Sequence, residues 1–341
     1  MAQLIKLQDF ISRYETDIFR YPSQYLRLKR ERWELIKAAC SLDEGSVEDK
    51  PNFENTQSGG VKFAGFEDYD EDWLESGKKG VLGTIKHWFK KSKNGVETDD
   101  INTEFDNEAP NILWDKRKTK EEIKQEFLDE IFRFQINWAS STILDRSFVG
   151  EEIYHDDVLK YFLQHFPDNY FLLYKPTLFV KKAPIDLEII LISPVATFCI
   201  SIVESDEMSV FEMDRGRYWF ETIGEKNIKR INPLLSLNRA ESLVKGYYNH
   251  YNVEMPVHKI VLSRTGYIEG NYEPPNTFFV DKRNYSDWYA RLRRLPSPIK
   301  YVQLKGAQAL LKHTQSTYVR RNEWEKTEDE IYFNDDDPDF F

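Results

Sequence analysis

Cysteine is scarce in this chain of 341 residues: there are two, Cys40 and Cys199. Neither stands in a Cys-x-x-Cys or Cys-x-x-His pattern, so the sequence encodes neither a disulfide framework nor a cysteine-rich zinc site. Long apolar runs are also missing, since the longest, Ile189 to Val203, is interrupted by Ser193-Pro194. The N-terminus carries no basic region followed by an apolar stretch. These absences favour a cytoplasmic protein with no signal peptide and no stable membrane span.

Histidine is also sparse, with six residues, and no glycine-rich phosphate loop or Ser/His/Asp order appears. Serine-hydrolase and nucleotide-binding classes are therefore unsupported. The formal net charge of -11 is distributed unevenly. Acidic residues dominate 41–112 and 323–341, whereas basic residues outnumber acidic ones in 146–322. Charge therefore permits nucleic-acid binding by 146–322 without requiring it.

Composition and periodicity divide the chain into five parts. Residues 1–40 predict an N-terminal helical segment, because apolar residues recur there at helical spacing. Residues 41–117 have the composition of an acidic flexible linker, and 323–341 that of an acidic disordered tail. Between them, 118–145 predicts a helix that opens with a capping box at Thr119 and Glu122 and packs on the main domain, residues 146–322.

One segment of the predicted linker differs from the rest. Gly80 to Lys93 combines four lysines with regularly spaced apolar residues, a basic amphipathic pattern. Such a segment can lie on an anionic membrane, dock in the groove of a partner, or pack on its own domain. The sequence leaves its role open.

The main domain predicts an α/β fold with a mixed central sheet flanked by helices. A helix is expected before Phe166-Pro167, and a longer one over Ser236 to Tyr251 after Asn232-Pro233. A near-continuous apolar strand follows at His258 to Ser263, the kind that is buried on both faces. The other strand-like runs are Tyr170 to Tyr174, Leu178 to Lys181, Ile185 to Ile192, Thr197 to Val203 and Arg217 to Thr222.

Five short motifs follow one another along this domain: Gly150-Glu151, Ile185-Asp186, Ser193-Pro194, Tyr218-Trp219 and Asn232-Pro233-Leu234. In this order and spacing they resemble the nuclease-related (NERD) family over about half of the chain. The resemblance implies a restriction-endonuclease-like fold with the PD-(D/E)xK arrangement of acids and a lysine. It also implies a role in DNA metabolism, with DNA as partner.

The resemblance makes Glu151 and Asp186 the first two carboxylates of the site. In such a site, hard oxygen ligands hold Mg²⁺, which polarises the scissile phosphate, and a lysine offsets the developing charge. The Glu-x-Lys of the family falls here on Ser201-Ile202-Val203, so one ligand and the lysine are absent. As structural alternatives, Asp186 would cap a turn at a strand end, and Glu151 would be a helix N-terminal acid.

Glu188 is the first candidate for the missing ligand, because it stands two residues after Asp186 in the same predicted strand and would face the same way. Glu204 lies just beyond the Ser-Ile-Val positions and would face the opposite side unless a bulge intervenes. The lysine could be replaced by Lys245 or Arg239 of the following helix. The predicted metal ligands are therefore Glu151, Asp186 and Glu188, and the wider catalytic set adds Glu204 and Lys245.

Two hypotheses for function follow. In the first, the domain is a degenerate module, non-catalytic or weakly active, that binds nucleic acid or a DNA-processing partner. This is favoured because one relocated ligand must still reach productive geometry after both Glu and Lys are lost. In the second, it is an active DNA endonuclease or exonuclease with a relocated lysine, and Mg²⁺ is then its cofactor.

The C-terminus, Asp-Asp-Asp-Pro-Asp-Phe-Phe, resembles the tip of bacterial single-stranded DNA-binding proteins, which implies a protein partner. An acidic tail can also fold back on basic residues of its own domain and compete with DNA, or remain an ordinary solvated tail. The basic residues predicted to contact nucleic acid are Arg239, Arg291, Arg293, Arg294 and Lys300.

Overall fold

The computed structural model describes residues 1–43, 118–205, 208–295 and 297–321. They belong to two compact units: the first comprises Met1–Arg27 and the chain from Phe127 onward, and the second comprises Leu28–Glu126. The predicted linker beyond residue 43, its amphipathic segment and the acidic tail lie outside the described residues. No described helix combines the length and hydropathy that a membrane span requires.

The second unit contains the end of helix α2 (Tyr21–Asp43) and the start of helix α6 (Lys120–Trp138). The predicted capping box at the start of α6 is confirmed. The Glu122 carboxylate accepts a hydrogen bond from the Thr119 N–H at 2.7 Å, and the Thr119 hydroxyl accepts one from the Glu122 N–H at 3.3 Å. This reciprocal pair satisfies two N–H groups that have no partner within the helix.

The chain begins with a strand where the sequence predicted a helix. All five residues of β1 (Gln3–Leu7) are buried, and the strand pairs in parallel with β3 (Phe171–Tyr174). A short apolar run is compatible with a strand and a helix alike, so the partner strand decides between them. Helical structure starts only at α1 (Arg13–Thr16), where the hydroxyl of the N-cap residue Ser12 accepts a hydrogen bond from the Tyr14 N–H.

The core of the first unit is a mixed six-stranded sheet in the order β1-β3-β6-β7-β11-β13. Strands β3, β6 and β7 run antiparallel to one another in succession, whereas β7, β11 and β13 are parallel. The predicted mixed sheet flanked by helices is thus confirmed. The bounds of the four further strands are β6 (Ile189–Ile192), β7 (Thr197–Ile202), β11 (Val257–Leu262) and β13 (Thr277–Val280).

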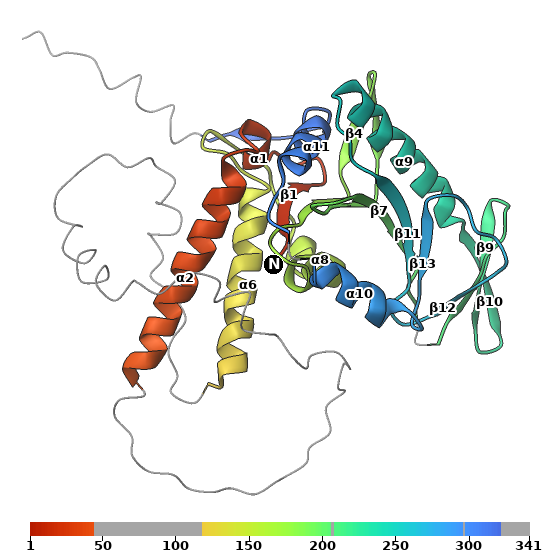
Figure 1. Cartoon of the computed structure of the whole chain (residues 1–341), viewed down its shortest axis with the longest axis horizontal. Helices are drawn as coiled ribbons and strands as arrows, with labels where there is room; N and C mark the ends of the chain where they lie inside the picture. The colour runs from red at the N-terminus through yellow and green to blue at the C-terminus, as the bar shows by residue number, and fades with distance from the viewer. Residues whose placement is uncertain (44–117, 206–207, 296, 322–341) are drawn as a thin grey trace, which may run out of the picture. The chain divides into compact units, whose positions relative to one another are not determined.

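Helices cover the sheet on both sides. In Figure 1, α9 (Pro233–His250) lies above strands β7 and β11, and α8 (Asp157–His165) and α10 (Tyr285–Arg293) lie below them. Helix α9 starts as predicted at Asn232-Pro233, because the Asn232 side chain accepts a hydrogen bond from the Leu234 N–H and Pro233 suits the first helical turn. The remaining helices are α7 (Glu151–Tyr154) and α11 (Tyr301–Leu311).

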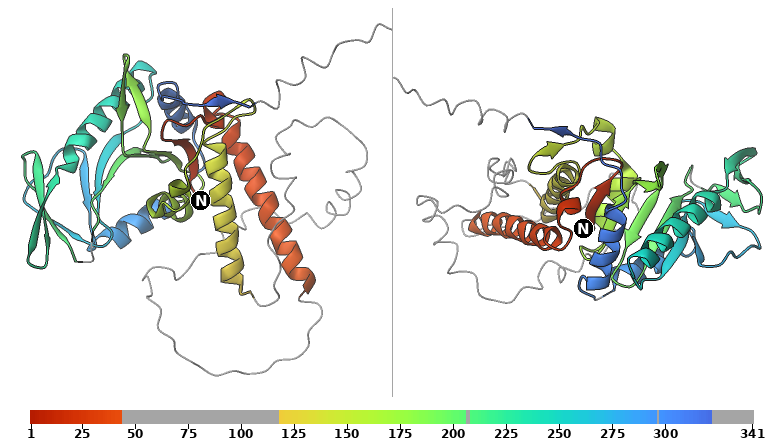
Figure 2. Two further views of the ribbon diagram at one scale, coloured as in Figure 1. Left: turned by 180° about the vertical axis from the view of Figure 1, so that it is seen from behind. Right: turned by 90° about the horizontal axis from the view of Figure 1, so that it is seen from above.

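Three smaller sheets complete the described fold. The largest has four strands in the order β10-β9-β8-β12, and it corresponds in part to the predicted strand Arg217 to Thr222. Figure 2 shows the hairpin of β9 and β10 at the rim of the unit. The strands of this four-stranded sheet are β8 (Val210–Glu212), β9 (Tyr218–Ile223), β10 (Lys226–Ile231) and β12 (Tyr267–Glu269). The other two sheets have two strands each: β4 (Thr177–Val180) pairs with β5 (Ala183–Asp186), and β2 (Asp145–Arg146) pairs with β14 (Val319–Arg320).

The predicted strand Ile185 to Ile192 is wrong as a single element. Its first part belongs to β5 and its second to β6, and these strands lie in different sheets. The break occurs because the chain bonds back to the preceding turn: the Leu187 N–H donates to the Pro176 carbonyl at 3.0 Å, and the Glu188 carbonyl accepts from the Lys175 N–H at 2.6 Å. Alternation of side chains therefore does not carry from Asp186 to Glu188.

Candidate functional site

The three predicted metal ligands lie in a helix, in a strand and in the connection between two strands. Glu151 is the exposed first residue of α7. Asp186 is exposed at the end of β5, where its carboxylate accepts a hydrogen bond from the Thr177 hydroxyl at 2.6 Å. Glu188 is half-buried before β6, and its carboxylate accepts a hydrogen bond from the Ser236 hydroxyl of α9 at 2.5 Å.

Within the described ranges, no three His, Cys, Asp or Glu side chains are grouped so that they could hold a metal ion. The expected set of Glu151, Asp186 and Glu188 is therefore not assembled as a three-ligand centre. The physical reason is the break between β5 and β6, which removes the common strand that was to align Asp186 with Glu188. Asp186 instead bonds across its hairpin to Thr177, the residue that it faces on β4, and it does not cap a turn there.

A second group of charges, which we call the α9 polar cluster, consists of Asn238, Glu241 and Lys245 of α9 and Lys259 of β11. The Lys259 ammonium donates to the Asn238 side chain at 2.7 Å and lies 3.1 Å from the Glu241 carboxylate. The other oxygen of Glu241 accepts from Lys245 at 2.7 Å. Burial alone would raise the pKa of Glu241, but its hydrogen bonds to Lys245 and Lys259 hold that pKa below the ordinary value.

Lys259 was missed by the sequence prediction, although the sequence contains a signal. It is a lysine in the middle of the apolar strand that runs to Leu262, and only 3% of it is exposed. A lysine in a strand that is buried on both faces requires a partner. Lys245, the predicted replacement for the catalytic lysine, has 43% of its side chain exposed and bonds to Glu241.

Glu204 follows the end of β7 and is held by a cation that follows β11. The Arg264 guanidinium donates to the two carboxylate oxygens of Glu204 at 2.6 and 2.7 Å, and the Arg264 N–H donates at 2.8 Å. The same guanidinium lies 4.4 Å from the ring centroid of Tyr161, whose hydroxyl is 2.7 Å from that of Tyr285. A carboxylate with three donors ties two strand ends together, and it has little capacity left for a metal ion.

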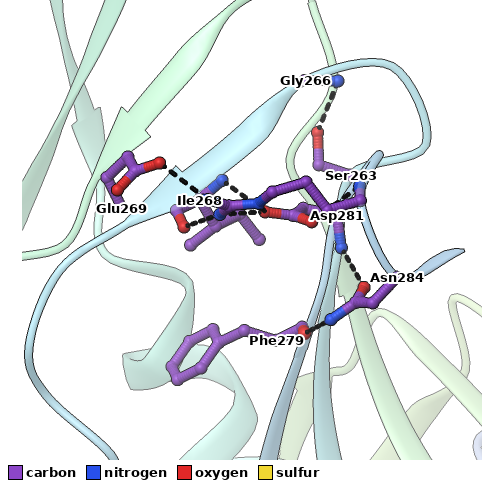
Figure 3. Close-up of polar contacts among 8 residues, drawn as sticks. Ser263, Gly266, Ile268, Glu269, Phe279, Asp281 and Asn284 are labelled. Atoms are coloured by element: carbon purple, nitrogen blue, oxygen red, sulfur yellow. Dashed lines mark hydrogen bonds and ion pairs between the residues drawn. The ribbon is translucent and has the colours of Figure 1, made fainter.

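The next strand end carries a comparable network (Figure 3). Asp281 follows β13, and its carboxylate accepts from the Ile268 N–H at 3.2 Å and from the Arg283 side chain at 2.9 Å. The Asp281 N–H donates to the Asn284 side chain at 2.9 Å. Burial would raise the pKa of Asp281, but the hydrogen bonds of Arg283 and Ile268 hold it below the ordinary value. Arg283 also donates to Glu269 at 2.9 Å.

The predicted nucleic-acid residues lie on α9, on α10 and at the start of α11. Arg239 and Lys300 are exposed, and Lys300 is the N-cap residue of α11. Arg291 of α10 and Arg294, the C-cap residue of that helix, are exposed and line a surface hollow of about 400 Å³ together with Asp287 and Ala290. Arg293 is half-buried, with its guanidinium 5.7 Å from the centroid of the Tyr289 ring. Their contact with nucleic acid stays a prediction.

Comparison with known proteins gives one informative similarity. No protein-family model and no solved structure matches the chain. A curated protein of Geobacillus stearothermophilus, described as an RNA 2',3'-cyclic phosphodiesterase, is 30% identical to it over 141 residues. The matched region is 40% of this chain and 36% of that protein, so the chain spans about a third of the length of the curated relative that it matches.

Proposed function

We propose that residues 146–322 form a nuclease-related module of restriction-endonuclease-like fold that binds nucleic acid and has lost most or all of its metal-dependent catalysis. The described mixed sheet with helices on both sides is compatible with that fold. The similarity to a protein described as an RNA 2',3'-cyclic phosphodiesterase supports a nucleic-acid ligand. The resemblance of the five ordered motifs to the NERD family supports the same conclusion.

The observation that carries this proposal is that acids around the sheet are already bonded to donors of the protein itself. Glu204 is bonded to Arg264, Glu241 to two lysines and Asp281 to Arg283. A carboxylate that already accepts charged donors has few oxygen lone pairs for a cation. Of the predicted ligands, Asp186 and Glu188 accept hydrogen bonds from hydroxyl groups instead. Because no three His, Cys, Asp or Glu side chains in the described ranges are grouped so that they could hold a metal ion, the arrangement supports a module without a resident Mg²⁺.

The electrostatics of the module suit a polyanion. Exposed cations follow one another along α10 and into α11, where Arg291, Arg294 and Lys300 are all solvent-accessible. Such cations position a phosphate backbone without reading its sequence, and their contribution falls as salt rises. We therefore assign backbone binding to this surface and expect little dependence on base sequence.

A second candidate function is phosphodiester hydrolysis, and the similarity to the Geobacillus protein favours it. In that case Asp186 and Glu188 are the acids to test, because the first is exposed and the second is half-buried. Glu188 accepts a hydrogen bond from Ser236 in the first turn of α9, where the positive end of the helix dipole stabilises its negative charge.

One experiment separates the two functions. Fluorescence anisotropy with labelled DNA and RNA, single-stranded and duplex, measures binding at low and moderate salt. Cleavage is measured on the same molecules and on an oligoribonucleotide that ends in a 2',3'-cyclic phosphate, with Mg²⁺, Mn²⁺ or a chelator. The variants are Asp186→Ala and Glu188→Gln, and Glu254→Gln, an exposed acid beyond the end of α9, is the control.

We expect binding that weakens with salt, and little or no cleavage in wild type or variants. Cleavage that is lost in Asp186→Ala or Glu188→Gln but kept in Glu254→Gln would overturn the non-catalytic assignment and establish the second function. Absence of binding to every nucleic acid at low salt, together with absence of cleavage, would reject both.

A further inference from the structure

The hairpin of β9 and β10 presents a face that the proposed site does not use. Tyr218 is paired with Ile231 and Phe220 with Lys229 in the antiparallel register. Because directly paired residues point to the same side of a sheet, and residues two apart along a strand do as well, these four side chains share one face. We call Tyr218, Phe220, Lys229 and Ile231 the hairpin face.

Burial shows that the hairpin face points away from the core. The alternate residues of β9, Trp219 and Glu221, are 1% and 0% exposed, and Trp219 packs against Phe279 of the central sheet. In contrast, Phe220 is 39% exposed and Ile231 68% exposed. Figure 1 and the left view of Figure 2 show no described helix on the outer side of these strands.

Cations accompany the half-buried Tyr218 ring of this face. The Lys229 ammonium lies 3.8 Å from the centroid of the Tyr218 ring, and the Arg217 guanidinium lies 5.7 Å from it. Glu221 does not offset these charges, because it is on the buried face and is bonded to Arg230 at 2.6 Å. Two exposed acids continue the row at the margin of the face: Glu212 of β8 is paired with Phe220, and Glu269 of β12 is paired with Glu212. Glu269 is bonded to Arg283.

We propose that the hairpin face binds single-stranded nucleic acid. A base stacks on the Phe220 ring beside Ile231, and Lys229 and Arg217 contact the flanking phosphates. An exposed ring on a sheet with cations beside it suits unpaired bases, because stacking needs a free base face that a duplex does not offer. The inference rests on the proposed nucleic-acid function, but it concerns a surface separate from α10 and from Glu188.

Edge strands provide a competing explanation for the lysine. β10 is at the edge of its sheet, and exposed lysines on such a strand hinder pairing with another chain. That explanation predicts that removing the charge increases self-association. It requires no aromatic ring beside the lysine and no effect of Phe220 on ligand binding, so the two accounts differ in a measurable way.

The test is fluorescence anisotropy of the full chain with a labelled single strand of about 15 nucleotides, against a duplex of the same sequence, over a salt series. The variants are Phe220→Ala and Lys229→Gln. The control for the ring is Phe148→Ala, since Phe148 is 71% exposed and lies under the Arg146 guanidinium elsewhere in the unit. The control for the charge is Lys182→Gln, at an exposed lysine next to β5.

We expect Phe220→Ala to weaken single-strand binding about fivefold or more, with the salt dependence unchanged. Lys229→Gln should lower the slope of log affinity against log salt by about 0.7, the value for one phosphate contact on a single strand. Duplex binding should change little in either variant, because it uses the α10 surface. The two control variants should match the wild type.

Several results would overturn the inference. An equal loss in Phe148→Ala or Lys182→Gln would show that the effect is not local, and self-association of Lys229→Gln with unchanged binding would support the edge explanation. If the wild type binds duplex and Phe220→Ala has no effect on single strands, the hairpin face is rejected while the proposed function stands. If the wild type binds no nucleic acid, both are rejected.

Discussion

Replacing Glu241 by leucine tests how the α9 polar cluster is held together. The substitution removes the acid that lies between Lys245 and Lys259. The two lysines respond differently, because the Lys245 side chain is 43% exposed whereas that of Lys259 is 4% exposed. In the variant, Lys259 loses its charged partner and keeps the hydrogen bond to the neutral side chain of Asn238.

The expected cost follows from this difference in burial. Removing one partner of a buried ion pair costs about 3–5 kcal/mol, because the remaining charge is left without compensation. The exposed Lys245 contributes about 1 kcal/mol at most. For a domain of this size class, a loss of 3–5 kcal/mol lowers Tm by roughly 6–20 °C, at about 2–4 °C per kcal/mol. Leucine favours helix formation, so α9 itself should not be weakened.

The double variant Glu241→Leu with Lys259→Met separates pairing from packing. Removing both charges leaves an apolar contact of similar volume, so most of the lost stability should return. Urea unfolding followed by circular dichroism at pH 7 measures the free energy of unfolding of wild type, single and double variants. Lys245→Met is the control and should stay close to wild type.

Acidic pH gives an independent check with a defined sign. The pKa of folded Glu241 lies below its ordinary value of 4.5. The group therefore stabilises the wild type above that pH, and this contribution is lost as the pH falls through the folded pKa. The double variant should lose less stability on acidification than the wild type. A cost below about 1 kcal/mol for Glu241→Leu, or a double variant no more stable than the single one, would refute the reasoning.

Three further predictions concern Phe166, Gly266 and His165 and can be checked by urea unfolding. Phe166→Ala should cost about 3–5 kcal/mol, because the ring is 1% exposed within a cluster of aromatic side chains; a cost near zero would contradict that packing. Gly266→Ala should cost about 1–3 kcal/mol, because the new Cβ would lie 2.7 Å from the Ser209 carbonyl oxygen. Burial and nearby arginine cations lower the pKa of His165 to about 4. As the pH falls from 7 to 4, His165 is therefore protonated in the unfolded chain before it is protonated in the folded one, and this should lower the free energy of unfolding by on the order of 3 kcal/mol. His165→Asn should show a smaller loss over the same range, and an equal loss would mean that His165 is not responsible.

Much of the fold could be predicted where neighbouring residues decide it. Asn232-Pro233 marks the start of α9, and Thr119 with Glu122 marks the start of α6. The apolar strand near His258 is found as β11, displaced by one residue. One exception is the N-terminus, where Leu4 and Leu7 have helical spacing yet lie in β1, because pairing with β3 buries every residue of the segment.

The candidate site was less predictable, because it depends on which strand ends meet. Glu188 was expected beside Asp186, but the return of the chain at Leu187 separates β5 from β6. Glu204 was considered as a ligand, whereas Arg264, 60 residues further along the chain, occupies its carboxylate. No local pattern indicates that pairing, since it arises from the parallel alignment of β7 and β11.

The sequence by itself determined the α/β class, the uneven charge and the positions of the capped helices, because periodicity, capping and composition act over a few neighbouring residues. Only the tertiary structure decided which acid meets which cation, and therefore that Lys259 has Glu241 and Asn238 as partners. The physical reason is that the stability of a buried charge depends on the group nearest to it in space. Strand pairing brings that group from a distant part of the chain.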